Sequence, residues 1–220
     1  MIMGAASLAF ALLHLVPASA APARPHPLTA QEISALTGLA AEQEKASQAP
    51  EPFSGEWDRP ECAPLFSVGQ EPAYGDDWSD YQETSTKAVS PNLGYPDPYP
   101  HYIRQVIARY PSAEEAGERL AALRAALDGC SDYRETGATA RCGGWEATPI
   151  PVPGPAVSWY RRSSSSGGSC NGSTAVYAIA RGEWLIQASA SAWLPSTTPK
   201  GLAANQIPQA VAERIASGLR

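Results

Sequence analysis

The sequence predicts an α+β fold: a single domain in which an antiparallel sheet packs against helices, cross-linked by two disulfides. Three observations support this prediction. The chain has 220 residues, of which 44% are hydrophobic, enough for one domain with a core. Two segments carry helix caps and apolar stripes. Several short segments are rich in β-branched and aromatic residues, as strands are.

Residues 1–20 have the pattern of a secretory signal peptide. An uncharged apolar run extends from Gly4 to Val16, and an Ala-Ser-Ala triplet suitable for cleavage follows it. The run is shorter than the ~20 residues that a membrane-crossing helix needs, so we expect no stable transmembrane span. Residues 21–27 form a Pro-rich linker, and residues 28–220 form the domain. We therefore expect a secreted or envelope-associated, extracytoplasmic protein.

Two helices are indicated by their caps. In the first, Thr29 and Glu32 are spaced as a capping box, and Gly38 marks the end. In the second, Ser112 and Glu115 have the same spacing, and an apolar stripe follows. That stripe comprises Ala113, Ala116, Leu120, Leu123 and Leu127, and Gly129 ends the helix. A third helix is predicted over residues 205–217 from its mixed apolar face.

The strands are predicted from composition and alternation. Residues 101–110 form one strand, whose alternation places Tyr102, Arg104, Val106, Ala108 and Tyr110 on one face. Further strands are predicted within 142–152, 156–163, 173–180 and 183–193, the last two joined by a compact turn at Arg181-Gly182. Between residues 40 and 60 the periodicity is lost, and we expect a solvated loop at residues 74–81.

Four cysteines lie in the predicted domain: Cys62, Cys130, Cys142 and Cys170. An even number in an exported chain is typical of two disulfides, and four cysteines allow three pairings. No two of them are spaced as a zinc site or a redox motif requires. We therefore expect no metal, no cofactor and a purely structural role for these residues.

Charge and motifs exclude two functional classes. The formal net charge is -6, and the largest basic cluster is Arg161-Arg162, so we expect no nucleic-acid partner. No GxSxG motif is present, and His101 is the one histidine outside the signal and linker that could act as a base. Its place beside a proline at a strand entrance suits a surface position. We therefore expect no catalytic residues and no enzymatic activity, with an exported hydrolase the least favoured alternative.

The order of motifs resembles the PknH-like extracellular sensor domain of mycobacteria and related actinobacteria. The resemblance covers most of residues 28–219. It rests on LTAQEISALTG, the PECA around Cys62, IRQVIARYPSAEEA, the DGC at Cys130, the cysteine pair that follows, and VYAIARGEWLI. It implies a sheet packed with helices and a cleft for an unidentified extracellular ligand. It also implies disulfides joining Cys62 to Cys130 and Cys142 to Cys170, and no known enzymatic activity.

The sequence departs from the family pattern in having no kinase domain, no membrane span and no lipobox cysteine. We therefore expect a binding domain rather than a complete receptor. Its partner would be an unknown small molecule or envelope component, with a protein partner also possible. The residues that we expect to contact a ligand are Arg104, Tyr110, Trp159 and Tyr160, because alternation places polar and aromatic groups on sheet faces there. Each of the four has a competing role in core packing.

A different class, a structural or interaction protein, stays open. Six tryptophans would suit stacking on an envelope glycan. They are Trp57, Trp78, Trp145, Trp159, Trp184 and Trp193. This alternative requires two or more of them to line one open groove, with Arg104, Arg161 or Arg181 nearby to fix a polar group. Tryptophans that are scattered through the core would count against it.

Overall fold

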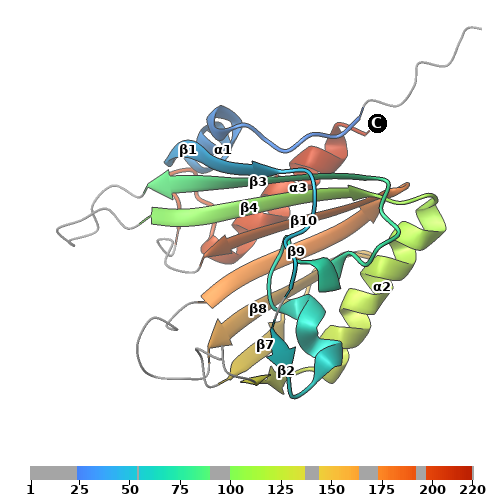
Figure 1. Ribbon diagram of the computed structural model, residues 1–220. Helices are drawn as coiled ribbons and strands as arrows, with labels where there is room; N and C mark the ends of the chain where they lie inside the picture. Colours follow the sequence, from blue (N-terminus) through green and yellow to red (C-terminus); the bar gives the residue numbers. More distant parts are fainter. Residues whose placement is uncertain are drawn as a thin grey trace, which may run out of the picture.

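The computed structural model describes residues 24–53, 55–89, 100–136, 144–163, 173–191 and 197–219. Figure 1 shows a twisted sheet with helices on both of its faces. The elements are α1 (Ala30–Thr37), β1 (Ala40–Ser47), β2 (Glu56–Trp57), η1 (Pro60–Leu65), η2 (Glu71–Ala73), β3 (Asp80–Val89), β4 (Pro100–Arg109), α2 (Ala113–Gly129), β5 (Asp132–Tyr133), β6 (Glu135–Thr136), β7 (Trp145–Pro149), β8 (Val157–Ser163), β9 (Ser173–Arg181), β10 (Trp184–Ser191), η4 (Ala204–Gln206) and α3 (Ile207–Ser217). The α+β prediction is thus confirmed.

The main sheet is antiparallel, with the strand order β1-β3-β4-β10-β9-β8-β7-β5 within the described residues. The hairpin β9–β10 lies at its centre. Arg181 pairs with Trp184, so the two turn residues are Gly182 and Glu183. Gly182 has φ 54°, which a primed hairpin turn requires. The prediction of a compact hairpin is therefore confirmed, but its turn is one residue later than expected.

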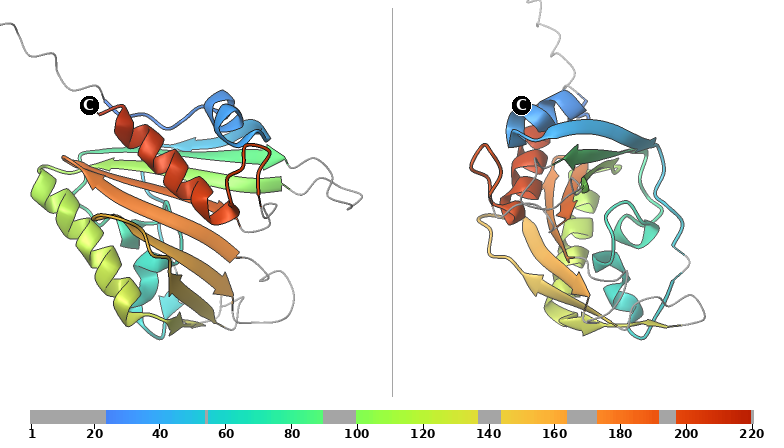
Figure 2. Two further views of the ribbon diagram at one scale, coloured as in Figure 1. Left: turned by 180° about the vertical axis from the view of Figure 1, so that it is seen from behind. Right: turned by 90° about the vertical axis from the view of Figure 1, so that its left-hand side faces the viewer.

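Each face of the sheet buries its own core. On one face α1 and α3 cover the strands, and their apolar residues pack on β4, β9 and β10. On the other face α2 and η1 cover mainly the half of the sheet that contains β7 to β10. Figure 2 shows α1 and α3 on one side of the sheet and the turns of η1 on the other. The half-covered second face is the one that carries the candidate site.

The capping box predicted for α1 is formed, and at α2 the Ser112 half of the predicted box is formed. The Thr29 hydroxyl accepts the Glu32 N–H at 3.2 Å, and the Glu32 carboxylate accepts the Thr29 N–H at 2.9 Å. Gly38 ends α1 in the left-handed region. At α2 the Ser112 hydroxyl accepts the Glu115 N–H at 3.1 Å. None of the helices in the described part of the chain is long and apolar enough to cross a membrane.

Two of the long strands are absent from the prediction. Residues 40–47, where periodicity is lost, form β1, a largely exposed edge strand. Residues 80–89 form β3, which is buried at alternating positions but carries polar side chains such as Glu83 there. The loop expected at residues 74–81 is solvated only in its middle, because Tyr74 and Tyr81 are buried at its two ends. Hydrophobic alternation cannot detect strands whose buried positions are polar.

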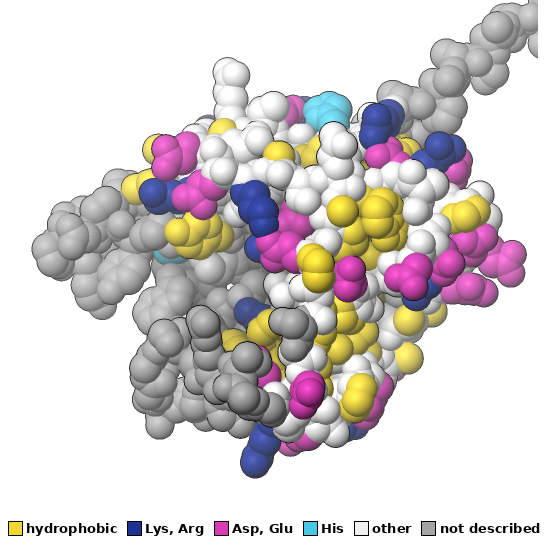
Figure 3. Space-filling model, in the orientation of Figure 1, with side chains coloured by type: hydrophobic (Ala, Val, Ile, Leu, Met, Phe, Trp, Pro, Cys, Tyr) yellow, Lys and Arg dark blue, Asp and Glu magenta, His cyan; other side chains and the backbone are white. Residues whose placement is uncertain are grey.

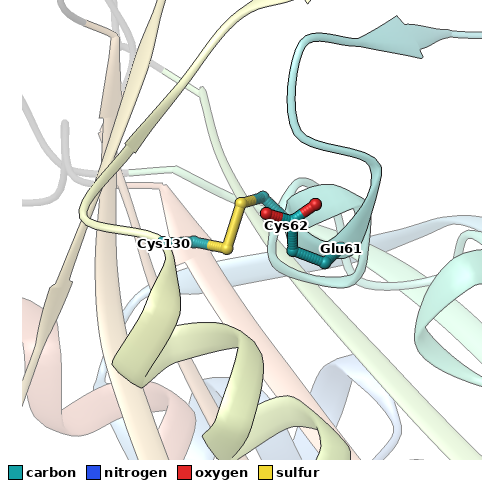
Figure 4. A group of neighbouring side chains, drawn as sticks. All are labelled: Glu61, Cys62 and Cys130. Carbon is teal, nitrogen blue, oxygen red and sulfur yellow. A yellow bond between two sulfur atoms is a disulfide. The ribbon is translucent and has the colours of Figure 1, made fainter.

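The Cys62–Cys130 disulfide joins η1 to the end of α2, with a Cα–Cα distance of 5.7 Å (Figure 4). This bond confirms one of the two pairs that the family resemblance implies. Glu61 lies beside it, but both sulfurs are used in the disulfide, so this cluster is not a metal site. The expected Cys142–Cys170 pair lies outside the described residues.

A candidate ligand-binding groove on the sheet

An open groove of about 450 Å³ lies on the sheet face that carries η1. Its volume is in the range of small-molecule sites, about 300–1,000 Å³. In Figure 3 this face is hollowed near its centre, and Lys and Arg side chains are visible at the hollow. The lining residues are Glu44, Lys45, Phe66, Ser67, Val68, Ser85, Tyr102, Arg104, Arg161, Thr174, Val176, Ser189 and Ser191.

Strand register brings the floor of the groove together from distant parts of the sequence. One cross-strand row contains Arg161 on β8, paired with Thr174 on β9, which is paired in turn with Ser191 on β10. Ser191 also accepts the backbone N–H of Tyr102 on β4 at 3.2 Å. Because these side chains share one face and two of them are short, the sheet stays open here.

The adjacent row continues the floor towards β3. Ser85 on β3 pairs with Arg104 on β4, which pairs with Ser189 on β10 and then with Val176 on β9. The hydroxyls of Ser85 and Ser189 make no hydrogen bond to any residue that the structure describes. Five strands therefore present small polar side chains and two guanidinium groups to one groove.

The wall of the groove is the segment Phe66-Ser67-Val68, which directly follows η1. The disulfide at Cys62 fixes this segment from one side. On the side of the sheet, the indole N–H of Trp159 on β8 donates to the Leu65 carbonyl oxygen at 3.4 Å. A wall that is held covalently and by a buried ring loses little conformational entropy when a ligand binds.

Arg104 is held at the base of the wall by two kinds of partner. Its Nη1 donates to the Val68 carbonyl oxygen at 2.6 Å and to the Ser67 hydroxyl at 3.4 Å. Its Nε lies 3.3 Å from a carboxylate oxygen of Glu83, and its Nη1 lies 4.0 Å from Glu51. The charge of Arg104 is therefore largely compensated from within the protein.

Glu83 is the buried member of this pair, with 1% of its surface exposed. Burial raises the pKa of its carboxyl, while the charge of Arg104 and the hydrogen bond from Tyr81 act in the opposite direction. The Tyr81 hydroxyl donates to Glu83 at 2.9 Å. Glu83 also packs against Gly69, where a Cβ would lie 2.7 Å from its Oε2. The loop from η1 to η2 thus closes over a polar network beside the groove.

Arg161 differs from Arg104 in its surroundings. Its guanidinium carbon lies 4.9 Å from the Phe66 ring centroid and 4.6 Å from that of Trp145. Its Nη1 donates to the Phe66 carbonyl oxygen and its Nη2 to the Thr174 hydroxyl at 3.3 Å. Burial lowers the pKa of Arg161 to about 10, and the positive charge of Arg104 acts in the same direction. Arg161 stays charged at neutral pH, in a partly desolvated site.

The structure places the four predicted contact residues in different surroundings. Arg104 lines the groove. Tyr110 is fully buried and its hydroxyl donates to the Tyr74 carbonyl oxygen at 2.9 Å, and Trp159 is 1% exposed beneath the wall. Tyr160 is half-buried and, being next to Trp159 on a strand, points to the opposite face of the sheet. The groove brings Arg104 together with Arg161, which alternation alone does not single out.

His101 is not at the surface as expected, because it is 1% exposed. It lies on the strand position next to Tyr102, on the face that α1 and α3 cover. Burial lowers the pKa of its imidazole, so it is neutral at neutral pH. The sheet lies between His101 and the groove. His101 therefore cannot act as a base on a ligand in the groove.

None of the five described tryptophans lines the groove. Trp57, Trp145 and Trp159 are buried, and Trp78 and Trp184 are partly buried at other places. The sixth, Trp193, lies outside the described residues. Trp57 and Trp145 both pack on Phe66, with ring centroids 4.7 and 5.3 Å apart, and so support the wall from the core. The requirement for a tryptophan-lined glycan groove is not met in the described part of the chain.

A larger hollow, of about 720 Å³, lies beside α3 at the β9–β10 turn. Its carboxylates have partners: Glu183 is paired with Arg109 at 2.8 Å, and Glu213 accepts from Tyr177 at 3.2 Å. Arg181 in this hollow is exposed to solvent. We take the smaller groove as the candidate site, because polar side chains from several strands converge there on a guanidinium whose pKa is lowered by burial.

A family model described as PknH-like extracellular domain matches residues 16–214. The fold is similar to the crystal structure of the extracellular domain of PknH from Mycobacterium tuberculosis. The TM-score is 0.63 at 14% identity, over 87% of this chain and 93% of that one. An uncharacterised protein from Mycobacterium smegmatis aligns with TM-score 0.36 at 11% identity, over 82% and 86% of the two chains, too low to support any argument. No curated protein sequence matches significantly.

Proposed function

The chain belongs to the PknH-like extracellular domain family, and on that premise we propose that it is an exported, non-catalytic sensor domain that binds a small extracellular ligand. The groove on the sheet is the proposed binding site. One observation carries this proposal: residues from six strands and from the segment after η1 converge on an open groove whose wall is fixed by a disulfide. Converging polar groups on a preorganised frame are what small-molecule binding requires.

Three further features belong to this proposal. We propose that residues 1–20 are a signal peptide and that residues 28–220 form the domain. We also propose that Cys142 and Cys170 form a second disulfide. The export that the signal peptide implies and the observed Cys62–Cys130 bond support that pairing, because disulfides persist in oxidising compartments.

The second candidate is a domain that recognises an envelope macromolecule. A small ligand is favoured instead, because the groove is lined by side chains from the sheet rather than by a row of exposed rings. Tyr102, at one end of the groove, is the one exposed large hydrophobic residue in the described part of the chain. A single exposed ring is too little for a stacking platform along a polymer.

A thermal-shift screen of the oxidised protein tests the proposed function. The set would contain envelope glycans, lipids, peptidoglycan fragments and small metabolites. A ligand present at about 100 times its Kd stabilises by about 2.7 kcal/mol, which raises the Tm of a domain of this size by roughly 5–11 °C. Such a saturable shift is the expected result for at least one compound.

Two variants locate the site. Ser189→Leu fills the floor of the groove, whereas Thr148→Leu adds the same side chain at an exposed position on β7. The ligand shift should disappear in Ser189→Leu and persist in Thr148→Leu, with the fold of both checked by circular dichroism. An unchanged shift in Ser189→Leu would show that the ligand binds elsewhere. No shift with any compound would favour a protein partner.

A further inference from the structure

Arg161 has no carboxylate partner among the described residues, and its guanidinium is faced instead by the Phe66 and Trp145 rings and two neutral oxygen acceptors. No described carboxylate lies within 4.0 Å of its guanidinium, whereas Arg104 in the same groove lies beside Glu83 and Glu51. The Arg161 Nε is fully buried without a hydrogen-bond partner. Desolvated charges in proteins are normally paired, because an uncompensated one costs several kcal/mol. A missing counter-charge therefore points to a group that arrives from outside.

The donors of Arg161 are arranged to receive such a group. A guanidinium has five N–H donors, and the bonds to Phe66 and Thr174 occupy one hydrogen on each Nη atom. One N–H on each Nη atom remains, and the side chain lines the groove. Two coplanar donors match the two oxygens of a carboxylate or a phosphate. The rings of Phe66 and Trp145 hold the guanidinium plane in position.

The rest of the groove is suited to hydroxyl groups. The hydroxyls of Ser85 and Ser189 make no hydrogen bond to a described residue, and Ser67, Thr174 and Ser191 also line the groove. A serine or threonine hydroxyl both donates and accepts, as the hydroxyls of a sugar do. These side chains lie on two adjacent cross-strand rows, one that begins at Arg161 and one that reaches Ser85 on β3. One ligand can therefore contact the guanidinium at one end and the hydroxyls along its length.

We propose that the groove binds a small polyhydroxylated anion, a sugar carrying a carboxylate or a phosphate, with Arg161 as the anchor of the anionic group. This inference rests on the proposed function, because it assigns the ligand class of the same groove. The anion would also lie between two guanidinium groups whose charges repel each other when the groove is empty. Arg104 contributes to the field, but Glu83 and Glu51 already compensate most of its charge.

Isothermal titration calorimetry of the oxidised full chain tests the ligand class. The probes are glucose 6-phosphate, glucuronate, glucose and inorganic phosphate, at neutral pH and one ionic strength. We expect saturable binding of glucose 6-phosphate or glucuronate, and which of the two binds distinguishes phosphate from carboxylate. Glucose and inorganic phosphate should each bind at least tenfold more weakly, because each lacks one half of the recognised chemistry.

Matched variants test the anchor. In Arg161→Gln the Kd should rise about 10- to 100-fold, the usual effect of losing hydrogen bonds to a charged group. Arg161→Lys keeps the charge and loses the planar pair of donors, so the Kd should still rise about tenfold. This variant tests the anchor if the glutamine variant does not fold. Arg162→Gln is the control, because that neighbour is 69% exposed and paired with Glu146 on the surface.

Several results would overturn the inference. These are equal affinity for glucose and the anionic sugars, wild-type affinity in Arg161→Lys, and a loss in Arg162→Gln as large as in the Arg161 variants. If no anionic sugar binds but another compound gives a shift that Ser189→Leu abolishes, the anion assignment is wrong and the proposed function stands. If neither the probes nor the screen show binding, both are wrong.

Discussion

Removing the Cys62–Cys130 disulfide should destabilise the protein strongly. The bond closes a loop of 68 residues. The entropy that such a cross-link removes from the unfolded chain corresponds to about 4 kcal/mol. Both cysteines are fully buried, so replacing them with alanine leaves no buried polar group behind. The Cys62→Ala/Cys130→Ala double variant should therefore lose about 4 kcal/mol of the ~5–15 kcal/mol that stabilises a typical domain.

Urea unfolding under oxidising conditions measures this loss. The midpoint should fall in the double variant, and the Tm should drop by roughly 8–16 °C, since 1 kcal/mol corresponds to about 2–4 °C for a domain of this size. Cys142 and Cys170 are left in place, so the change reports on one bond. A loss below about 1 kcal/mol would refute the reasoning, because it would mean that the unfolded chain is already restrained.

The same variant separates the frame of the groove from its chemistry. The disulfide fixes η1, and the wall residues Phe66 to Val68 follow η1 directly. Ligand affinity should therefore decrease although no contact residue has changed, because ordering the wall then opposes binding. Equal affinity in the two proteins, measured where both are folded, would show that Trp159 and the core hold the wall without the disulfide.

Three other changes have defined outcomes. Because burial raises the pKa of Glu83 above its usual value of 4.5, its contribution to stability is complete below pH 4.5 and is lost as the pH rises through the folded-state pKa. Glu83→Gln should remove this loss, so its urea midpoint relative to wild type should rise with pH; a constant difference would contradict the argument. Gly69→Ala should lower the free energy of unfolding by about 1–3 kcal/mol, because φ of Gly69 is +92° and the added Cβ would clash with Glu83. Thermal unfolding measures this loss, and an unchanged Tm would mean that the loop adjusts without strain. Tyr110→Phe should lower stability by about 1 kcal/mol through the lost hydrogen bond to Tyr74 and leave ligand affinity unchanged, and a change in affinity would place Tyr110 in the site after all.

Local sequence signals predicted the helices well. The caps of α1 and α2 are decided by residues three positions apart, Thr29 with Glu32 and Ser112 with Glu115. Such signals do not depend on the rest of the fold. Strand β4 was found for a similar reason, because its alternating apolar residues fill two cores. Strand β3 was missed because its buried face carries Glu83 and Ser85, which form the polar network and the groove instead of a core.

The groove was only partly predictable, because the pairing register of the strands determines which side chains meet in it. Alternation shows that Trp159 and Arg161 share one face of β8 and that Tyr160 points to the other. It does not show which face is open, or where η1 covers it. In the structure η1 lies over Trp159 and stops before Arg161, so the ring becomes core and the guanidinium becomes part of the groove. The position of Thr174 beside Arg161 results from the pairing of β8 with β9, which the sequence alone does not show.

The two edges of the sheet determine how this domain can contact other molecules. Strand β1 at one edge is mostly exposed, carries Glu42, Glu44 and Lys45, and has an irregular register between Gln43 and Lys45. At the other edge β5 has only two residues. Charges, bulges and short strands at an edge oppose the addition of a strand from another chain, and with it aggregation. A protein that responds to the occupied groove would therefore dock on helices or loops rather than extend the sheet.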